Sequence, residues 1–352
     1  MSRDLVFHLG DFKTGSTALQ DWLVRHGAEH GIFCPAVDHA ALAQSLADPA
    51  ARAAGFATLA EELQDSGLPH AVVSAEHFEF ADPALLLAAI ETHLPGLAPA
   101  LRLVAYVRPH AEALLARYGE SVKIGNFTGD LDSYMAWSPT RWRLSYAPRF
   151  GRWRAVFGDR FTLRLYRRAD FPGGDVIRDF AGFVTGRDPG HDPGHDPGPP
   201  AEPLLSNPAP GQRDLALLLA LHRAIGALPQ HSPMAAARWT LGRHLGRMLA
   251  DRARGASPAD MPLRLHRALA DRLLVRFAKD AAATDVAFFA GTPLSAALAA
   301  APGQAVETAV SLDPADHLSL DARAVIDLWA GMLRSGLQSA DTATALMRIY
   351  HE

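Results

Sequence analysis

Residues 5–17, LVFHLGDFKTGST, combine residue types and spacing that suit phosphate binding. An apolar run is followed by Gly10 and Gly15, which bracket a tight loop, and Ser16 begins a segment that can continue as a helix. A strand, a glycine loop and a helix start present several backbone N–H groups to a phosphate. In an ATP-type loop, lysine follows the second glycine, whereas here Lys13 precedes it. The alternative is a strand-to-helix turn that binds no ligand.

Charged residues follow two further apolar runs. Ala71–Ala75 ends at Glu76 and His77, and Arg102–Val107 ends at Arg108. In parallel sheets, ligands gather at the carboxyl ends of the strands. We therefore expect these side chains to lie at the same edge of a sheet as the glycine loop.

The elements that must position these residues alternate between strand and helix. A fourth apolar run, Phe161–Tyr166, completes the predicted strands, and Asp82-Pro83 is a typical helix start. The predicted helices in this part of the chain are Ser16–Gly27, Ala84–Thr92 and Ala111–Lys123. This alternation predicts an α/β fold, a three-layer sandwich with a central, mostly parallel sheet and a P-loop-like phosphate-binding loop.

Composition narrows the classes of function. The chain has 352 residues, of which 49% are hydrophobic and 20% charged, and its formal net charge is -4. Basic residues are scattered, so a nucleic-acid partner is not expected. Cys34 is the single cysteine, which excludes a disulfide framework and a cysteine-based zinc site within the chain. No apolar stretch approaches the length of a membrane span, and we expect a cytoplasmic protein without one.

The second half of the sequence has a different character. Residues 186–203 repeat Asp-Pro-Gly-His, which predicts an irregular loop, and its histidines are not expected to hold a metal. Helical patterns follow from Gln212 onward. Helices are predicted at Ala237–Arg254, Leu263–Lys279, Leu320–Arg334 and Ala340–Tyr350. We expect residues 1–300 to form the main domain and residues 301–352 a helical C-terminal extension.

The displaced lysine leads to a family resemblance. Gly10-Asp-Phe-Lys-Thr-Gly-Ser-Thr17 resembles the 5′-phosphosulfate loop of bacterial sulfotransferases that use 3′-phosphoadenosine 5′-phosphosulfate (PAPS). Several later stretches resemble the same family in the same order: Gly31–Pro35, Val72–His77, Tyr106–Gly125, Trp153–Asp159, Leu165–Arg167 and Ile177–Phe180. The resemblance covers residues 1–185 well and about 205–295 more loosely. It implies a sulfotransferase domain within residues 1–300.

The resemblance also implies roles for individual residues. Lys13 is the candidate for stabilising charge on the bridging oxygen, together with the N–H groups of Thr14–Thr17 and the hydroxyls of Ser16 and Thr17. The acceptor must lose a proton, and Glu76 or the adjacent His77 is the candidate base. Gly10, Gly15 and these loop residues would hold the donor's 5′ side.

Arg108 resembles the arginine that grips the donor's 3′-phosphate, for which a bidentate guanidinium is suited. The family expects a serine eight residues later, where this chain has Ala116 followed by Arg117. A lost hydrogen bond to a charged group corresponds to roughly 10–100-fold weaker binding. Arg117 is a candidate compensating residue, although it is one helical position away.

The resulting expectation is a PAPS-dependent sulfotransferase that needs no metal and acts on a hydroxyl of a carbohydrate, lipid or small metabolite. One alternative is a nucleotide-dependent P-loop kinase, for which the Gly-Lys-Ser/Thr sequence and a second acidic magnesium ligand are missing. The other is a degenerate relative that binds nucleotide without catalysis. The sequence does not identify the acceptor or the oligomeric state.

Overall fold

The computed structural model describes residues 4–187, 209–228, 232–255 and 260–337. Most of the loop at 186–203 and the helix expected at Ala340–Tyr350 lie outside the described residues. The chain divides into two compact units, each made of several stretches of sequence. The first unit contains Met1–His110, Ser145–Ser206 and Phe277–Leu298, and the second contains Ala111–Leu144, Asn207–Arg276 and Ala299–Glu352. The expected division into a domain of residues 1–300 and an extension stays a prediction.

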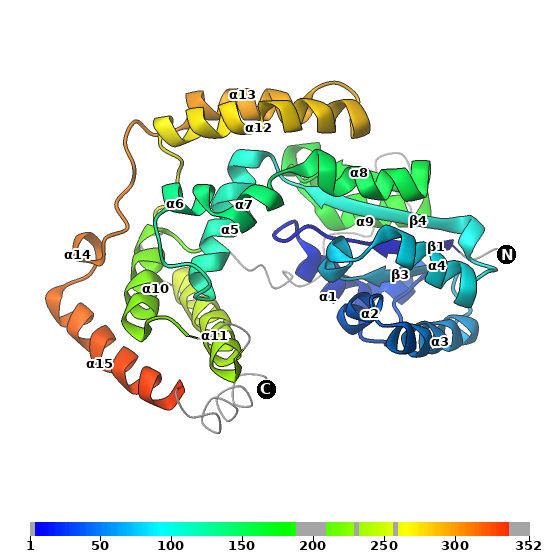
Figure 1. Cartoon of the computed structure of the whole chain (residues 1–352), viewed down its shortest axis with the longest axis horizontal. Helices are drawn as coiled ribbons and strands as arrows, with labels where there is room; N and C mark the ends of the chain where they lie inside the picture. Colours follow the sequence, from blue (N-terminus) through cyan, green and yellow to red (C-terminus); the bar gives the residue numbers. More distant parts are fainter. Residues whose placement is uncertain (1–3, 188–208, 229–231, 256–259, 338–352) are drawn as a thin grey trace. The chain divides into compact units, whose positions relative to one another are not determined.

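The first unit is built on a five-stranded sheet with the order β2-β3-β1-β4-β5, in which every neighbouring pair is parallel (Figure 1). Its strands are β1 (Asp4–His8), β2 (Ile32–Phe33), β3 (His70–Ser74), β4 (Leu101–Val107) and β5 (Phe161–Leu165). Its helices are α1 (Ser16–His26), α2 (His39–Ser45), α3 (Pro49–Asp65), α4 (Pro83–His93), α8 (Tyr146–Phe157) and α9 (Val176–Thr185). The predicted α/β class with a parallel sheet is confirmed.

Helices cover both faces of this sheet. On one face, β-strand residues such as Val6 and Val104 share a core with Trp22 of α1 and Phe180 of α9. On the other, Phe7 of β1 packs edge-on against Phe78, with ring centroids 5.1 Å apart. The second face is also covered by α8, whose Phe150 stacks on Phe161 of β5. The alternation of side chains along each strand produces these two apolar faces.

Strand β1 is the middle strand, and this places the glycine loop. The chain leaves β1 toward β2 and β3 on one side, then passes to β4 and β5 on the other. Register pairs Leu5 with Ala71 of β3 and with Leu101 of β4. The order therefore reverses beside β1, and in open α/β sheets ligands bind at the strand ends next to such a reversal.

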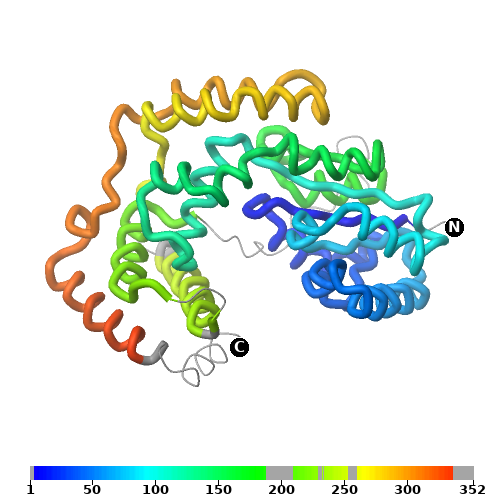
Figure 2. Tube along the Cα trace, viewed as in Figure 1, coloured from blue at the N-terminus to red at the C-terminus, as the bar shows by residue number. Residues whose placement is uncertain are grey.

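The second unit is helical. It contains α6 (Leu131–Ala136), α7 (Ser138–Arg143), α10 (Gln212–Ile225), α11 (Pro233–Gly255), α14 (Pro314–His317) and α15 (Leu320–Leu337). Three helices have residues in both units: α5 (His110–Lys123), α12 (Arg267–Phe288) and α13 (Pro293–Gln304). Figure 2 traces the path of the chain from its N-terminal to its C-terminal residues.

The local signals in the sequence explain most helix starts. The Asp82 carboxylate accepts a hydrogen bond of 2.9 Å from the backbone N–H of Ala84, which caps α4. Ser232 accepts one of 3.1 Å from Ala235 at the start of α11. The helix expected at Leu263–Lys279 begins later, at Arg267, and continues to Phe288. It starts where a β-bridge between His266 and Val306 ends the preceding extended segment.

Candidate functional site

The loop between β1 and α1 has an unusual backbone. Gly10, Lys13 and Gly15 all have positive φ, of 73°, 68° and 85°. Lys13 is the one non-glycine residue with positive φ among the described residues, and this conformation costs a lysine roughly 1–2 kcal/mol. Gly15 is the N-cap of α1, and no side chain caps that helix. The first N–H groups of α1 and its positive dipole end therefore lie at the loop, which is the arrangement that attracts an anion.

Glu76 lies directly against this loop. It begins the short 3₁₀ helix η2 (Glu76–Phe80), which follows β3. The Ser16 hydroxyl donates a hydrogen bond to its carboxylate. A Cβ built on Gly10 would stand 2.7 Å from Glu76 Cγ and 2.9 Å from Glu76 Cα. The backbone of the loop thus reaches Glu76 more closely than any other residue type would permit.

We expect Gly10→Ala to be more damaging than alanine at another glycine with the same φ. Gly174 also has a φ of 73°, but a Cβ there would approach no atom closer than 3.8 Å. Gly174→Ala should lower the free energy of unfolding by about 1–2 kcal/mol through backbone strain alone. Gly10→Ala should cost at least about 1 kcal/mol more, because Glu76 must move. Urea unfolding of both variants measures the difference, and equal costs would show that the two segments are not in close contact.

Arg108 contacts the loop from the other side. It follows β4, and its Nε donates a hydrogen bond to the carbonyl oxygen of Lys13. Its guanidinium lies over the ring of Tyr166, 4.3 Å from the centroid. A Cβ on Gly15 would be 3.2 Å from the same ring, so Tyr166 is also packed against the loop. The structure therefore brings Glu76, the loop and Arg108 together at the ends of three adjacent strands, as expected.

The remaining predicted residues have different surroundings. Thr14 is buried, and its hydroxyl donates to the Asp11 carbonyl at 2.6 Å, while Thr17 is exposed. His77 is half-buried on η2, and no described residue makes a hydrogen bond to its Nδ1. Arg117 belongs to the second unit, where its side chain is buried. Of the two candidate bases, Glu76 is the one whose contact with the loop is seen.

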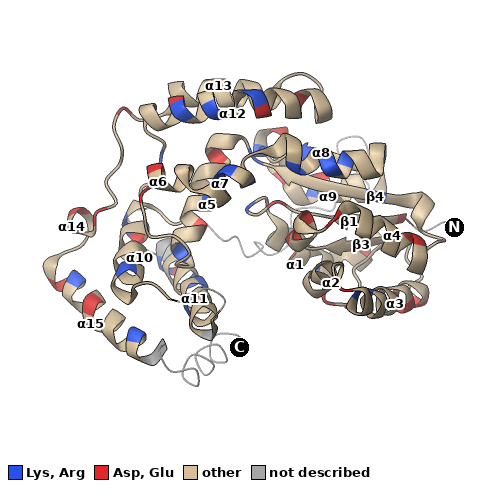
Figure 3. Cartoon of the chain, viewed as in Figure 1, with Lys and Arg blue, Asp and Glu red and all other residues tan. Residues whose placement is uncertain are grey.

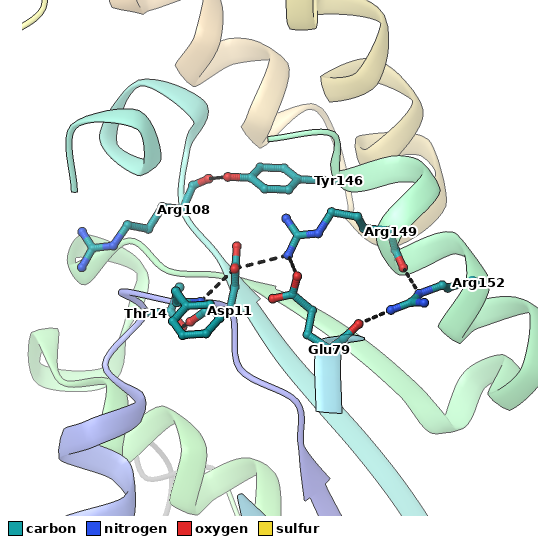
Figure 4. A network of polar contacts seen from close by, with 8 residues as sticks. Asp11, Thr14, Glu79, Arg108, Tyr146, Arg149 and Arg152 are labelled. Atoms are coloured by element: carbon teal, nitrogen blue, oxygen red, sulfur yellow. Dashed lines mark hydrogen bonds and ion pairs between the residues drawn. The ribbon is translucent and has the colours of Figure 1, made fainter. Parts of the chain in front are cut away.

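A buried cluster of charges beneath the loop was not predicted (Figure 4). Asp11, Glu79 and Arg149 are each at most 3% exposed. Arg149 Nη2 lies 3.3 Å from Asp11 Oδ1 and also donates to the Glu79 carboxylate. Arg152 donates to the Glu79 carbonyl oxygen. One signal was available in the sequence, because Arg149 stands on the same helical stripe as the buried aromatic residues of α8.

His8 ends the strand that leads into the loop and is fully buried. A hydrogen bond of 2.8 Å joins its Nδ1 to Ser74 Oγ on β3, and its ring lies against Phe180. Burial lowers the pKa of His8 from 6.5 to about 4. This agrees with its interpretation as a core histidine.

The low pKa of His8 makes stability depend on pH. Below pH 6.5 the unfolded chain binds a proton that the folded chain refuses until about pH 4, so stability is lost as pH falls through this range. At pH 5 the loss from His8 should be about 2 kcal/mol relative to pH 8. Urea unfolding of wild type and His8→Asn at both pH values tests this. The variant should show the smaller difference, and an equal difference would assign the titration to other groups.

Residues of the second unit that suggested phosphate or acceptor contacts are engaged within that unit. Lys123 is 3% exposed, pairs with Glu120 and accepts a hydrogen bond at its carbonyl from His222. Trp137 is half-stacked against Phe127, with centroids 5.5 Å apart. Figure 3 shows acidic and basic residues scattered over both units, in keeping with the expectation from composition.

Comparisons with protein-family models, with curated proteins and with solved structures find no match. Within the described ranges, no three His, Cys, Asp or Glu side chains are grouped so that they could hold a metal ion. None of the helices in the described ranges combines the length and apolar character needed to cross a bilayer.

Proposed function

We propose that this protein transfers a sulfuryl group from PAPS to an acceptor hydroxyl. The observation that supports the proposal most is the position of Lys13. It stands in a left-handed conformation within a loop that Glu76 contacts on one side and Arg108 on the other. A helix N-terminus without a side-chain cap adjoins the same loop. These are the groups that sulfuryl transfer requires: donors for the leaving oxygen, a base and an anchor for a second phosphate.

The donor's charges suit this arrangement. As the bond to sulfur breaks, negative charge develops on the bridging oxygen, where a fixed ammonium and helix N–H groups are most effective. Lys13 and the start of α1 would supply them. The guanidinium of Arg108 is held flat on Tyr166, so its orientation is set before a phosphate arrives. Gly10 and Gly15 permit a close backbone approach to the anion, since Cβ atoms there would meet Glu76 and Tyr166.

Glu76 is the proposed base. The Ser16 hydroxyl holds its carboxylate at the loop, so a hydroxyl acceptor beside the transferred group would be within reach of it. The base takes the acceptor proton, the acceptor oxygen bonds to sulfur, and the bridging oxygen leaves with the nucleotide. His77 is the alternative, on the next residue of the same turn.

A comparison of Glu76→Gln with His77→Asn distinguishes the two bases. If Glu76 accepts the proton, Glu76→Gln should lower turnover by about 100-fold or more and remove the ionisation on the acidic limb of the pH–rate profile. His77→Asn should leave that limb in place. A Glu76→Gln enzyme with normal turnover and an unchanged profile would assign the role elsewhere.

The proposed function is tested with the full chain, PAPS labelled at sulfur, and a panel of neutral and anionic hydroxyl acceptors in the presence of EDTA. Transfer of label without metal supports a sulfotransferase. Metal-dependent phosphoryl transfer from ATP, with no transfer of labelled sulfur, would replace it by the kinase alternative. Calorimetry with 3′,5′-adenosine bisphosphate completes the test, because binding without any turnover is the result expected of a non-catalytic relative.

A further inference from the structure

The first turns of α8 contact all three segments that form the candidate site (Figure 4). Arg149 reaches Asp11 in the loop and Glu79 on η2. The Tyr146 hydroxyl donates a hydrogen bond of 2.9 Å to the carbonyl oxygen of Arg108. Arg152 makes a second connection to η2 through the Glu79 carbonyl. One helix thus holds the segments that follow β1, β3 and β4.

Segment η2 is attached to the loop at two points. At its first residue, Glu76 accepts a hydrogen bond from Ser16. Three residues later, Glu79 is joined to Asp11 through the guanidinium of Arg149. Two attachments along one turn fix the orientation of the turn as well as its distance from the loop, which a single hydrogen bond cannot do. The position of Glu76 relative to Lys13 therefore depends on both.

We propose that Arg149 is a positioning residue that holds the Gly10–Thr17 loop and the Glu76 turn in one fixed register. The consequence for catalysis rests on the proposed function, but the coupling of the two segments does not. Arg149 acts through Asp11 and Glu79 and need not touch a substrate. A register error of about 1 Å between reacting groups can reduce rate by about 100-fold.

The chemistry of the cluster explains why arginine stands at this position. Asp11 and Glu79 are both buried carboxylates, and a guanidinium offers several donors in a rigid plane that can bridge two acceptors. A lysine carries the same charge on one nitrogen and is a poorer bridge. Asp11 has a further task, since its Oδ1 accepts a hydrogen bond of 2.8 Å from the N–H of Phe12. The cluster thereby reaches the backbone next to Lys13.

Arg149 is itself on a firm support. The backbone N–H groups of Tyr146 and Ala147 donate to the Asp280 carboxylate at 2.8 and 3.0 Å, which caps α8. Phe150 and Trp153 of the same helix are fully buried. A side chain on a packed and capped helix is a suitable fixed point for two segments that have little regular structure of their own.

The test compares Arg149→Lys, the triple variant Asp11→Asn/Glu79→Gln/Arg149→Met and the control Arg102→Met. The triple variant removes all three charges together, so no buried charge is left uncompensated and the fold is retained. Arg102 also bridges two segments, through Asp4 and the Phe183 and Val184 carbonyls, but it lies at the start of β4. Hydrogen exchange in peptides covering residues 9–17 and 75–81 is the first readout. Binding of 3′,5′-adenosine bisphosphate is the second.

Both segments should exchange about tenfold faster in the triple variant, with a smaller increase in Arg149→Lys and none in Arg102→Met. Affinity for the bisphosphate should fall by about tenfold in the triple variant. Unchanged exchange in a folded triple variant would overturn the proposal, as would an increase confined to one segment. If exchange responds as expected but the wild type neither binds the bisphosphate nor transfers sulfur, the positioning role stands and the proposed function is wrong.

Discussion

Lys13→Ala should lower turnover by about 100-fold or more, the usual cost of losing one fixed donor to a developing charge. The loss should fall on kcat more than on the affinity for PAPS, because the ammonium matters most once the bridging oxygen carries charge. Initial rates at saturating PAPS measure it. A companion variant, Lys13→Gly, separates catalysis from stability, since glycine accepts the φ of 68° without strain.

Lys13→Gly should have a free energy of unfolding within about 1 kcal/mol of wild type, because relief of strain offsets the added freedom of the unfolded chain. Its turnover should nevertheless fall as far as that of Lys13→Ala. Lys13→Arg keeps the charge but misplaces it, and we expect an intermediate rate. Turnover within a few-fold of wild type in the alanine and glycine variants would remove Lys13 from the mechanism.

Arg149→Met should be the most destabilising single substitution among the site residues, at about 3–5 kcal/mol. It leaves Asp11 and Glu79 as two buried carboxylates without their shared cation, and both are 1% exposed. Loss of contacts by a well-packed methionine is small in comparison. Equilibrium urea unfolding at pH 7 gives the value, with Arg102→Met as control, because its partner Asp4 is about one-third exposed and retains contact with water.

Adding Asp11→Asn and Glu79→Gln to Arg149→Met should restore most of the lost stability, since neutral amides are far less costly to bury than carboxylates. Wild-type-like stability of the single variant would mean that water reaches the carboxylates. Failure of the two amides to rescue it would mean that packing, rather than charge, is the main contribution of Arg149.

The sequence was sufficient to place the site because each site residue directly follows an apolar strand. The runs ending near His8, Ser74 and Val107 are short, uninterrupted and β-branched, which is typical of strands buried on both faces. Once such strands are parallel, the residues after them share an edge. The positions of Glu76 and Arg108 beside the loop therefore followed from chain order and polarity alone.

Other features had no comparable local signal. Strand β2 has two residues, Ile32 and Phe33, and is defined by pairing with β3 rather than by a pattern of its own. Arg149 meets Asp11 across 138 positions of sequence, and neither residue indicates the other. The role of Arg117 depends on packing in a different unit, which a helical periodicity does not determine.

The way the chain alternates between its two units has a practical consequence. Within the described residues, it passes from one unit to the other at positions 110–111, 144–145, 276–277 and 298–299. Neither half can be expressed by trimming one end, and a protease that cuts a single connection leaves the fragments tied through the others. Truncation libraries should therefore give few soluble fragments, and tags or fusion partners belong at the two ends rather than at an internal junction.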